Sequence, residues 1–312
     1  MQFSYKPQTH SEFEKGYRVH QPYAWPPASS LQPPASSPFF RYHAALLFQD
    51  GPMEFVLYLL LGGFAGVLAG LFGVGGGMII VPVLVFSFTL QGFDPQVLTH
   101  LAVGTSLATI IFTSLNSILA HHRKGAVLWP VVLWMTIGIL LGAALGSVTA
   151  ASIQGPMLQK IIGVFAIAMA IQMAFALQPK ASGGVPGKPG LTLAGVVVGW
   201  ASAIFGIGGG SLTVPFLSWR SVPMQQAVAT SAACGLPIAL VGALSFVVVG
   251  WQDAHLPEWS FGFVYLPALV GIAITSMFFA RIGAQLAHRL SAPMLKRLFA
   301  LLLLCVGINF LI

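Results

Sequence analysis

The stretch Ala69-Gly-Leu-Phe-Gly-Val-Gly-Gly-Gly-Met-Ile-Ile-Val-Pro82 returns later in the chain as Ser202-Ala-Ile-Phe-Gly-Ile-Gly-Gly-Gly-Ser-Leu-Thr-Val-Pro215. The phenylalanine, the glycines and the proline keep their spacing in both copies, and both copies lie in strongly apolar sequence. A glycine run breaks a helix, and inside lipid the freed backbone groups need protein, water or a ligand as partner. Two such breaks at corresponding places predict a transporter built from a duplicated unit, with its binding site at the breaks.

The composition is that of a membrane protein. Of the 312 residues, 56% are hydrophobic and only 7% are charged, against about 25% charged residues in a soluble domain. This predicts an all-α polytopic membrane protein whose main partner is the lipid bilayer. The net charge of +7 comes from basic residues scattered between apolar runs, so no nucleic-acid partner is expected. Cys234 and Cys305 both lie in apolar runs, which favours buried small side chains over a disulfide or a metal site.

The chain divides into four segments. Residues 1–52 are rich in Pro, Ser, Gln, Tyr and His and lack the pattern of a signal peptide, so they form either a disordered tail or a stretch ahead of a true start at Met53. Residues 53–177 (the first half) and residues 191–312 (the second half) flank a Gly/Pro/Lys linker at 178–190. Apolar runs are expected at about 53–71, 77–90, 97–119, 127–149, 157–177, 191–206, 209–219, 224–250, 261–280 and 294–312.

The second run of each half is too short to cross a ~30 Å hydrocarbon core as a straight helix. The duplication extends beyond the glycines, since Thr105-Ser106 matches Thr230-Ser231, and Pro156-Met-Leu matches Pro293-Met-Leu. We therefore expect two copies of one unit, each with four or five spans and a glycine-broken helix.

The charges predict an orientation. If residue 53 lies outside and every run crosses, one basic residue, Lys160, falls outside together with all four acids after residue 53. The basic residues that fall inside are Arg123, Lys124, Lys180, Lys188, Arg220, Arg281, Arg289, Lys296 and Arg297. Five crossings in each half would make the two repeats inverted. His121-His-Arg-Lys124 could be a metal or proton site, but a cytoplasmic loop that fixes this orientation is the favoured interpretation.

The glycine runs are the strongest candidates for a binding site. Each precedes a short apolar run, and the first N–H groups of a helix have no partner within it and carry partial positive charge. Two such ends could hold an anion without a buried arginine. The alternative is close helix packing through small residues. The candidate residues are Gly73, Gly75, Gly76 and Gly77 in the first half, and Gly206, Gly208, Gly209 and Gly210 in the second.

Hydroxyl and amide side chains could complete the site. Thr105, Ser106, Thr230 and Ser231 could donate to the same anion or could bond to their own helix carbonyls. Asn116 could contact the substrate or join two helices. His100 is a weaker candidate for coupling a proton. The apolar runs hold no acidic pair and no metal-binding pattern, so neither an enzyme nor a cofactor or metal site is expected.

The duplicated Phe-Gly-x-Gly-Gly-Gly motif, with the paired Thr-Ser stretches, resembles the TauE/SafE family of sulfite exporters, also called TSUP, over residues 53–312. The resemblance implies a multi-pass carrier in the cell (inner) membrane for small sulfur-containing anions such as sulfite, sulfoacetate or thiosulfate. It also implies about eight spans rather than ten. An anion channel or an intramembrane enzyme subunit stays open as an alternative, as does the coupling of a proton or a sodium ion.

Overall fold

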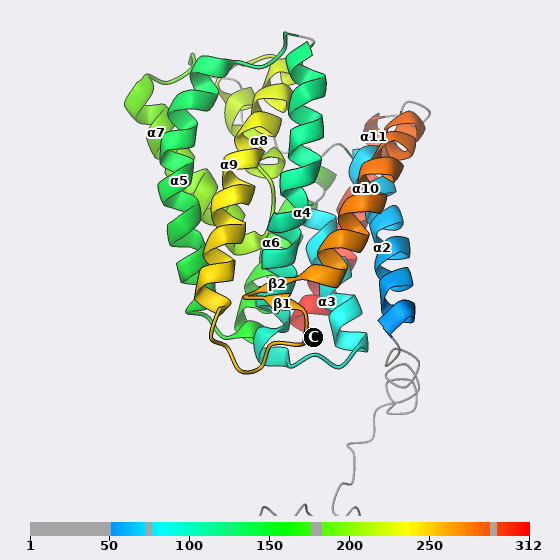
Figure 1. Ribbon diagram of the computed structural model, residues 1–312. Coiled ribbons are helices and arrows are strands. Elements are labelled where there is room, and N and C mark those ends of the chain that lie inside the picture. The colour runs from blue at the N-terminus through cyan, green and yellow to red at the C-terminus, as the bar shows by residue number, and fades with distance from the viewer. Residues whose placement is uncertain (1–50, 73–76, 124, 176–182, 288–291) are drawn as a thin grey trace, which may run out of the picture. The chain divides into compact units, whose positions relative to one another are not determined.

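The computed structural model describes residues 51–72, 77–123, 125–175, 183–287 and 292–312. The predicted tail, apart from its last two residues, lies outside these ranges, as do Gly73, Gly75 and Gly76. The described residues hold ten helices and one small hairpin of strands (Figure 1). The elements are α2 (Gly51–Phe72), α3 (Gly77–Leu90), α4 (Pro95–Arg123), α5 (Trp129–Ala151), α6 (Gly155–Ala174), α7 (Lys188–Phe205), α8 (Gly210–Trp219), α9 (Met224–Gly250), β1 (Ser260–Phe261), β2 (Val264–Tyr265), α10 (Leu266–Ala287) and α11 (Ala292–Leu311).

Six of the described helices are long and apolar enough to cross a membrane: α4, α5, α6, α7, α9 and α10. Their outward faces are apolar as well, since Leu133, Val248 and Phe278 are 61%, 73% and 76% exposed. In water such side chains would be costly, whereas in lipid they are solvated. The expected all-α, multi-pass membrane protein is therefore confirmed.

The helices follow the predicted apolar runs closely, with one exception. The run expected at 261–280 begins with the hairpin, in which Ser260 pairs with Tyr265 in antiparallel register. Gly262 makes the turn with φ of 55°, a conformation that glycine adopts without steric cost. Apolar content alone does not separate a short strand from the start of a helix, so the hairpin was not predicted from the sequence.

The two short helices each return toward the end of the bundle at which the preceding helix begins. The Tyr58 hydroxyl near the start of α2 donates to Oε1 of Gln91, directly after α3, at 2.8 Å. In the second half, the Ser221 hydroxyl after α8 donates to the carbonyl of Gly183 ahead of α7 at 3.1 Å. The ten residues of α8 rise only about 15 Å. Thus α2–α3 and α7–α8 are helical hairpins, and α8 does not cross the bilayer.

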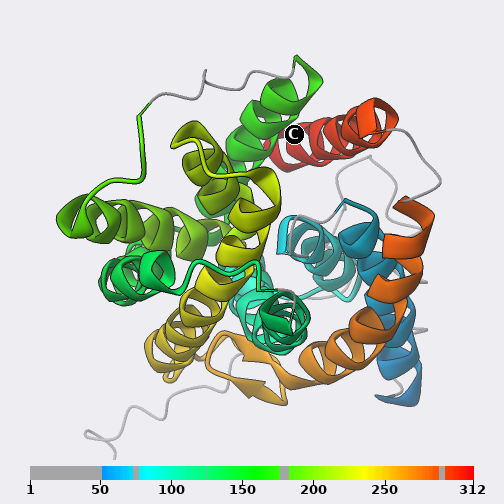
Figure 2. The same cartoon turned by 90° about the horizontal axis from the view of Figure 1, so that it is seen from above.

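The two halves interlock. Helix α2 packs along α10, and α5 packs along α7, in the two most extensive helix contacts of the described chain. Figure 2 shows these pairs on opposite sides of α4 and α9. Small residues permit both approaches, because a Cβ at Gly66 would lie 2.6 Å from the Cα of Ser276, and one at Gly142 would collide with the Val196 carbonyl. Glycines spaced four apart let backbones approach this closely.

Candidate functional site

The site grows from the break between α7 and α8. Gly206 ends α7 in the left-handed conformation, with φ of 64°, which favours glycine. The next helix begins at Gly210, and its first backbone bond runs from the Thr213 N–H to the Gly209 carbonyl at 2.8 Å. The N–H groups of Gly210, Ser211 and Leu212 therefore have no partner one turn earlier in α8. This end of α8 lies inside the bundle.

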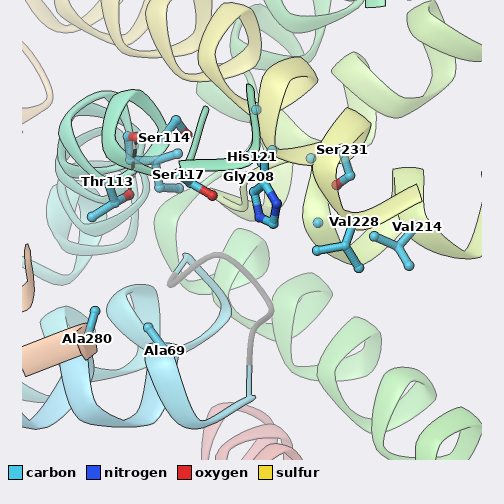
Figure 3. A pocket seen from close by; sticks show the side chains of 15 residues that line it. Ala69, Thr113, Ser114, Ser117, His121, Gly208, Val214, Val228, Ser231 and Ala280 are labelled. Atoms are coloured by element: carbon cyan, nitrogen blue, oxygen red, sulfur yellow. Dashed lines mark hydrogen bonds between the residues drawn. The ribbon is translucent and has the colours of Figure 1, made fainter. Parts of the chain in front are cut away.

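A cavity of about 260 Å³ lies against this helix start (Figure 3). The α8 side supplies Gly208, Gly209 and Gly210, and α9 supplies Ser231 and Gly235. Helix α4 forms the facing wall with Ile110, Thr113, Ser114, Ser117 and His121, while Ala69 of α2 and Ala280 of α10 border it from the other side. From Ile110 to His121 the wall extends about 16 Å along the helix axis, so the cavity runs from mid-bundle to the last turn of α4.

Ser231 is the most informative polar group of the cavity. Its side chain is 1% exposed, and its hydroxyl has no hydrogen-bond partner among the described residues. Figure 3 shows the hydroxyl directed toward the space occupied by the His121 ring. A buried hydroxyl without a partner costs about 1–3 kcal/mol. Ser231 borders the cavity, so a water or a bound molecule there is placed to supply the missing partner.

The glycines beside Ser231 are needed for packing as well. A Cβ at Gly209 would lie 2.8 Å from the Ser231 carbonyl oxygen and 3.2 Å from the Gly235 nitrogen. A Cβ at Gly77, the described glycine of the first run, would lie 2.7 Å from the Gly206 carbonyl oxygen. Gly209 thus permits close backbone contact and also borders the cavity, whereas Gly77 permits close contact without being part of the described lining.

The paired threonines have a structural role that their sequence pattern did not predict. The Thr105 hydroxyl accepts the Tyr265 N–H at 2.9 Å, and the Thr230 hydroxyl accepts the Leu128 N–H at 3.0 Å. Each bond joins one half to the other, directly ahead of the first residue of α10 or α5. Neither threonine lines the cavity. Their hydroxyls hold N–H groups at the start of a helix, where the helix itself offers no acceptor.

Ser106 also ties the halves together, since its hydroxyl donates to the Gly206 carbonyl at 2.9 Å. Asn116 is exposed on α4 and does not border the cavity. His100 is buried, with one ring nitrogen 3.2 Å from the Gln96 carbonyl and the other 3.0 Å from the Ile153 carbonyl. It fastens α4 to the turn after α5, away from the cavity.

Two of the α4 side chains that face the cavity were absent from the sequence-based candidates. Ser114 and Ser117 lie on one helix face with Thr113 and His121, at spacings of three and four residues. That polar stripe was a readable signal in the sequence. His121 was expected in a loop, and this was wrong: α4 continues to Arg123, so His121 belongs to its last turns.

The opposite end of the bundle is closed by aromatic rings. Phe88 stacks on Phe93 with centroids 4.9 Å apart, and Tyr265 meets Phe93 edge-on at 5.3 Å and Tyr58 at 5.8 Å. These four rings come from α2, α3, the turn before α4, and β2. Edge-to-face and stacked pairs of this kind add about 0.5–1.5 kcal/mol each beyond area burial. Aromatic rings thus pack together at this end of the bundle, whereas the cavity extends toward the end of α4.

The cavity offers donors rather than reactive groups. Its described lining contains backbone N–H groups, hydroxyls and one imidazole, but no carboxylate, amine, guanidinium or thiol. Hydroxyls, the backbone N–H groups at a helix start and its partial positive charge are suited to holding an anion.

The chain is similar to known membrane proteins. A family model described as "Sulfite exporter TauE/SafE" matches residues 58–310. A "Probable membrane transporter protein" of Haemophilus influenzae is 36% identical over 255 residues, covering 81% of this chain and 97% of the relative. Proteins of the same description from Methanocaldococcus jannaschii and Bacillus subtilis are 30% and 28% identical, covering 81% and 82% of this chain and 93% and 96% of the relatives. No solved structure matches the chain.

Proposed function

This chain belongs to the sulfite exporter TauE/SafE family, and we propose that it is a secondary carrier that exports small anions, sulfite or organosulfonates first among them. It is a membrane transporter and not an enzyme, as the family and its relatives indicate. The observation that carries the proposal is the Ser231 hydroxyl beside the start of α8, which has no hydrogen-bond partner among the described residues. An oxyanion placed there would accept from this hydroxyl and from the first N–H groups of α8 at once.

We assign the other predicted residues by their contacts. Gly208, Gly209, Gly210 and Ser231 bind the substrate, and Ser114 and Ser117 face it from α4. Thr105, Ser106 and Thr230 hold the frame around the site through the bonds described above. Gly73, Gly75 and Gly76 lie outside the described residues, and their role in binding stays a prediction.

We further propose that the halves are inverted copies of one unit that moves by alternating access. The interlocked contacts support this, because α2 pairs with α10 as α7 pairs with α5, and the two threonine bonds link matching positions. One end is packed with aromatic rings while the cavity extends toward the other. A carrier caught open to one side would have this asymmetry.

The charges support an orientation in the cell (inner) membrane. In Figure 1 the end of α4, with Arg123, and the start of α9, just after Arg220, lie at the upper end. The loop between α9 and α10, with Asp253 and Glu258, lies at the lower end. Basic loops face the cytoplasm, so we place the upper end there. The cavity then loads from the cytoplasm, as export requires.

Transport into liposomes tests the proposal. The purified full chain is reconstituted, and uptake of labelled sulfite, sulfoacetate, phosphate and chloride is compared with that of empty liposomes. We expect saturable uptake of at least one of the two sulfur oxyanions. If none of the four anions is taken up above the background of empty liposomes, the proposed function is refuted.

The same preparation separates a carrier from a channel. Liposomes preloaded with unlabelled substrate should take up labelled substrate faster than liposomes without internal substrate. The reason is that the binding site of a carrier reorients more readily with substrate bound than without it. A channel gives no such stimulation. Unsaturable uptake without stimulation by internal substrate would support the anion channel instead.

A further inference from the structure

One ionisable side chain lines the cavity among the described residues, and it is His121. In Figure 3 its ring lies between Ser117 of α4 and Ser231 of α9, close to Gly208. The ring thus stands beside the same space that the start of α8 and the Ser231 hydroxyl border. Imidazole is the side chain that in water changes charge between about pH 5 and pH 8.

The described residues that line the cavity together with His121 include no carboxylate. Ala69 of α2, Val214 of α8, Val228 of α9 and Ala280 of α10 line the same cavity as apolar groups. The charged or titratable groups next to these positions are His122 and Arg123 on α4, Arg281 on α10 and Arg220 after α8. The first three are exposed, and the Arg220 guanidinium lies over the Trp219 ring at 4.7 Å.

We propose that His121 carries a proton together with the anion, so that the protein is a proton-coupled anion carrier. The proposal rests on the proposed function, because it places the proton beside the anion at the same site. His121 accepts a proton from water in the cavity and becomes an imidazolium, whose N–H donates to the anion. When the anion leaves on the other side of the membrane, the imidazolium returns the proton to water there.

The coupling has a physical reason. An anion alone carries its charge into a low-dielectric interior at a high cost, whereas an anion paired with an imidazolium crosses with one unit less of net charge. A charge-assisted hydrogen bond is about twice as strong as a neutral one. Loss of the proton therefore weakens anion binding, and loss of the anion favours release of the proton.

The experiment uses the full chain in liposomes that contain a trapped pH-sensitive dye. Methanesulfonate and sulfite are each supplied outside, and labelled uptake is followed together with the internal pH. Methanesulfonate stays ionised throughout the working range, so protons that accompany it pass through the protein. With wild-type protein we expect acidification that follows uptake, and accumulation that rises when the outside is more acidic. If sulfite alone is carried, the proton count per sulfite is compared between wild type and the variants below.

Two substitutions test the charge of His121, one by removing it and the other by making it permanent. His121→Gln keeps a hydrogen-bonding group without the charge and should weaken apparent affinity roughly tenfold at about pH 6, with no accompanying proton. His121→Arg keeps a permanent charge and should bind the anion with an affinity that does not change between about pH 6 and pH 8. His122→Gln is the matched control, since His122 is exposed, accepts from the Trp129 indole at 3.3 Å and does not line the cavity. It should leave both fluxes unchanged.

The outcomes separate the two claims. Wild-type anion uptake without proton movement would overturn the coupling and leave the carrier intact, as would a His121→Gln variant that still moves one proton with each anion. Absence of uptake for all the anions offered to wild type would instead refute the carrier itself, and the coupling with it. If His121→Gln does not reach the membrane, His121→Arg decides, because retained pH dependence in that variant contradicts the proposal.

Discussion

The Thr-Ser pair of the first half and that of the second half have the same sequence but differ in one contact. Thr105 and Thr230 do the same work, since each hydroxyl accepts an N–H of the opposite half. The serines differ: Ser106 donates to the Gly206 carbonyl, whereas Ser231 has no partner among the described residues and borders the cavity. The threonines therefore belong to the frame, and one serine is left for a ligand.

This difference shows how two copies of one short sequence can take different roles beside the same cavity. Among the described residues, the cavity takes its glycines and the Ser231 hydroxyl from the second half and its facing wall from α4 of the first. The following predictions test how far the two halves are equivalent, beginning with the contacts that they share.

The largest effect is expected where helices of the two halves touch backbone to backbone. Gly66→Ala and Gly142→Ala each place a methyl group against an opposing backbone, which should cost about 3 kcal/mol or more, at the upper end for overpacking. Thermal unfolding in detergent should show similar losses for both. Gly63→Ala is the control, because its Cβ would lie 3.6 Å from the Phe279 ring in ordinary contact. Unequal losses for Gly66→Ala and Gly142→Ala would break the equivalence of the pairs.

A smaller effect is expected at the threonines. Thr105→Val and Thr230→Val each leave a backbone N–H without its acceptor, at a cost of about 1–3 kcal/mol. The loss should be larger for Thr105→Val, since its bond to Tyr265 is buried and the bond between Thr230 and Leu128 is partly buried. Serine keeps the hydroxyl, so Thr105→Ser and Thr230→Ser serve as controls in the same unfolding measurement. Equal stability of the valine and serine variants would argue against the frame role.

The smallest effects are expected at the two serines, where one substitution should change stability and the other should change affinity. Ser106→Ala removes a made hydrogen bond and should lower stability by about 1 kcal/mol with little change in apparent affinity. Ser231→Ala removes a hydroxyl that makes no hydrogen bond to the described residues, so the free energy of unfolding should stay the same or rise slightly. The apparent affinity for the transported anion should fall by up to roughly tenfold. Unfolding and transport are measured on both variants at equal protein in the liposomes. Loss of stability without loss of affinity in Ser231→Ala would remove that serine from the site.

The sequence alone predicted the elements well and their pairing poorly. Long apolar runs bounded by Gly and Pro mark helix ends, and the runs at 77–90 and 224–250 agree with α3 and α9 to the residue. The pairing of α2 with α10 could not be predicted. Glycines such as Gly62 and Gly66 mark a helix face lined by small residues, but they do not reveal which helix packs against it. The threonine bonds were missed for a related reason, since the N–H groups that they accept lie far away in the sequence.

The site was partly foreseen. Gly208, Gly209, Gly210 and Ser231 were selected from the glycine run and the Thr-Ser repeat, and the structure brings them together around one cavity. Their role in binding stays a prediction. His121 was misplaced because two histidines, an arginine and a lysine in a row resemble a polar loop, whereas the helix continues beneath them and turns one ring inward.

The interlocking of the halves also sets an order of events during synthesis. Helix α2 is complete at Phe72, but α10, along which it packs, begins at Leu266. At a typical rate of about 5–20 residues per second, the ribosome needs roughly 10–40 s to supply that partner. During this interval, the small-residue face of α2 that later packs against α10 can contact only lipid or the insertion machinery. The first half alone lacks α10, the partner of α2, and α7, the partner of α5. Its helices therefore cannot complete their packing until the second half has been synthesised.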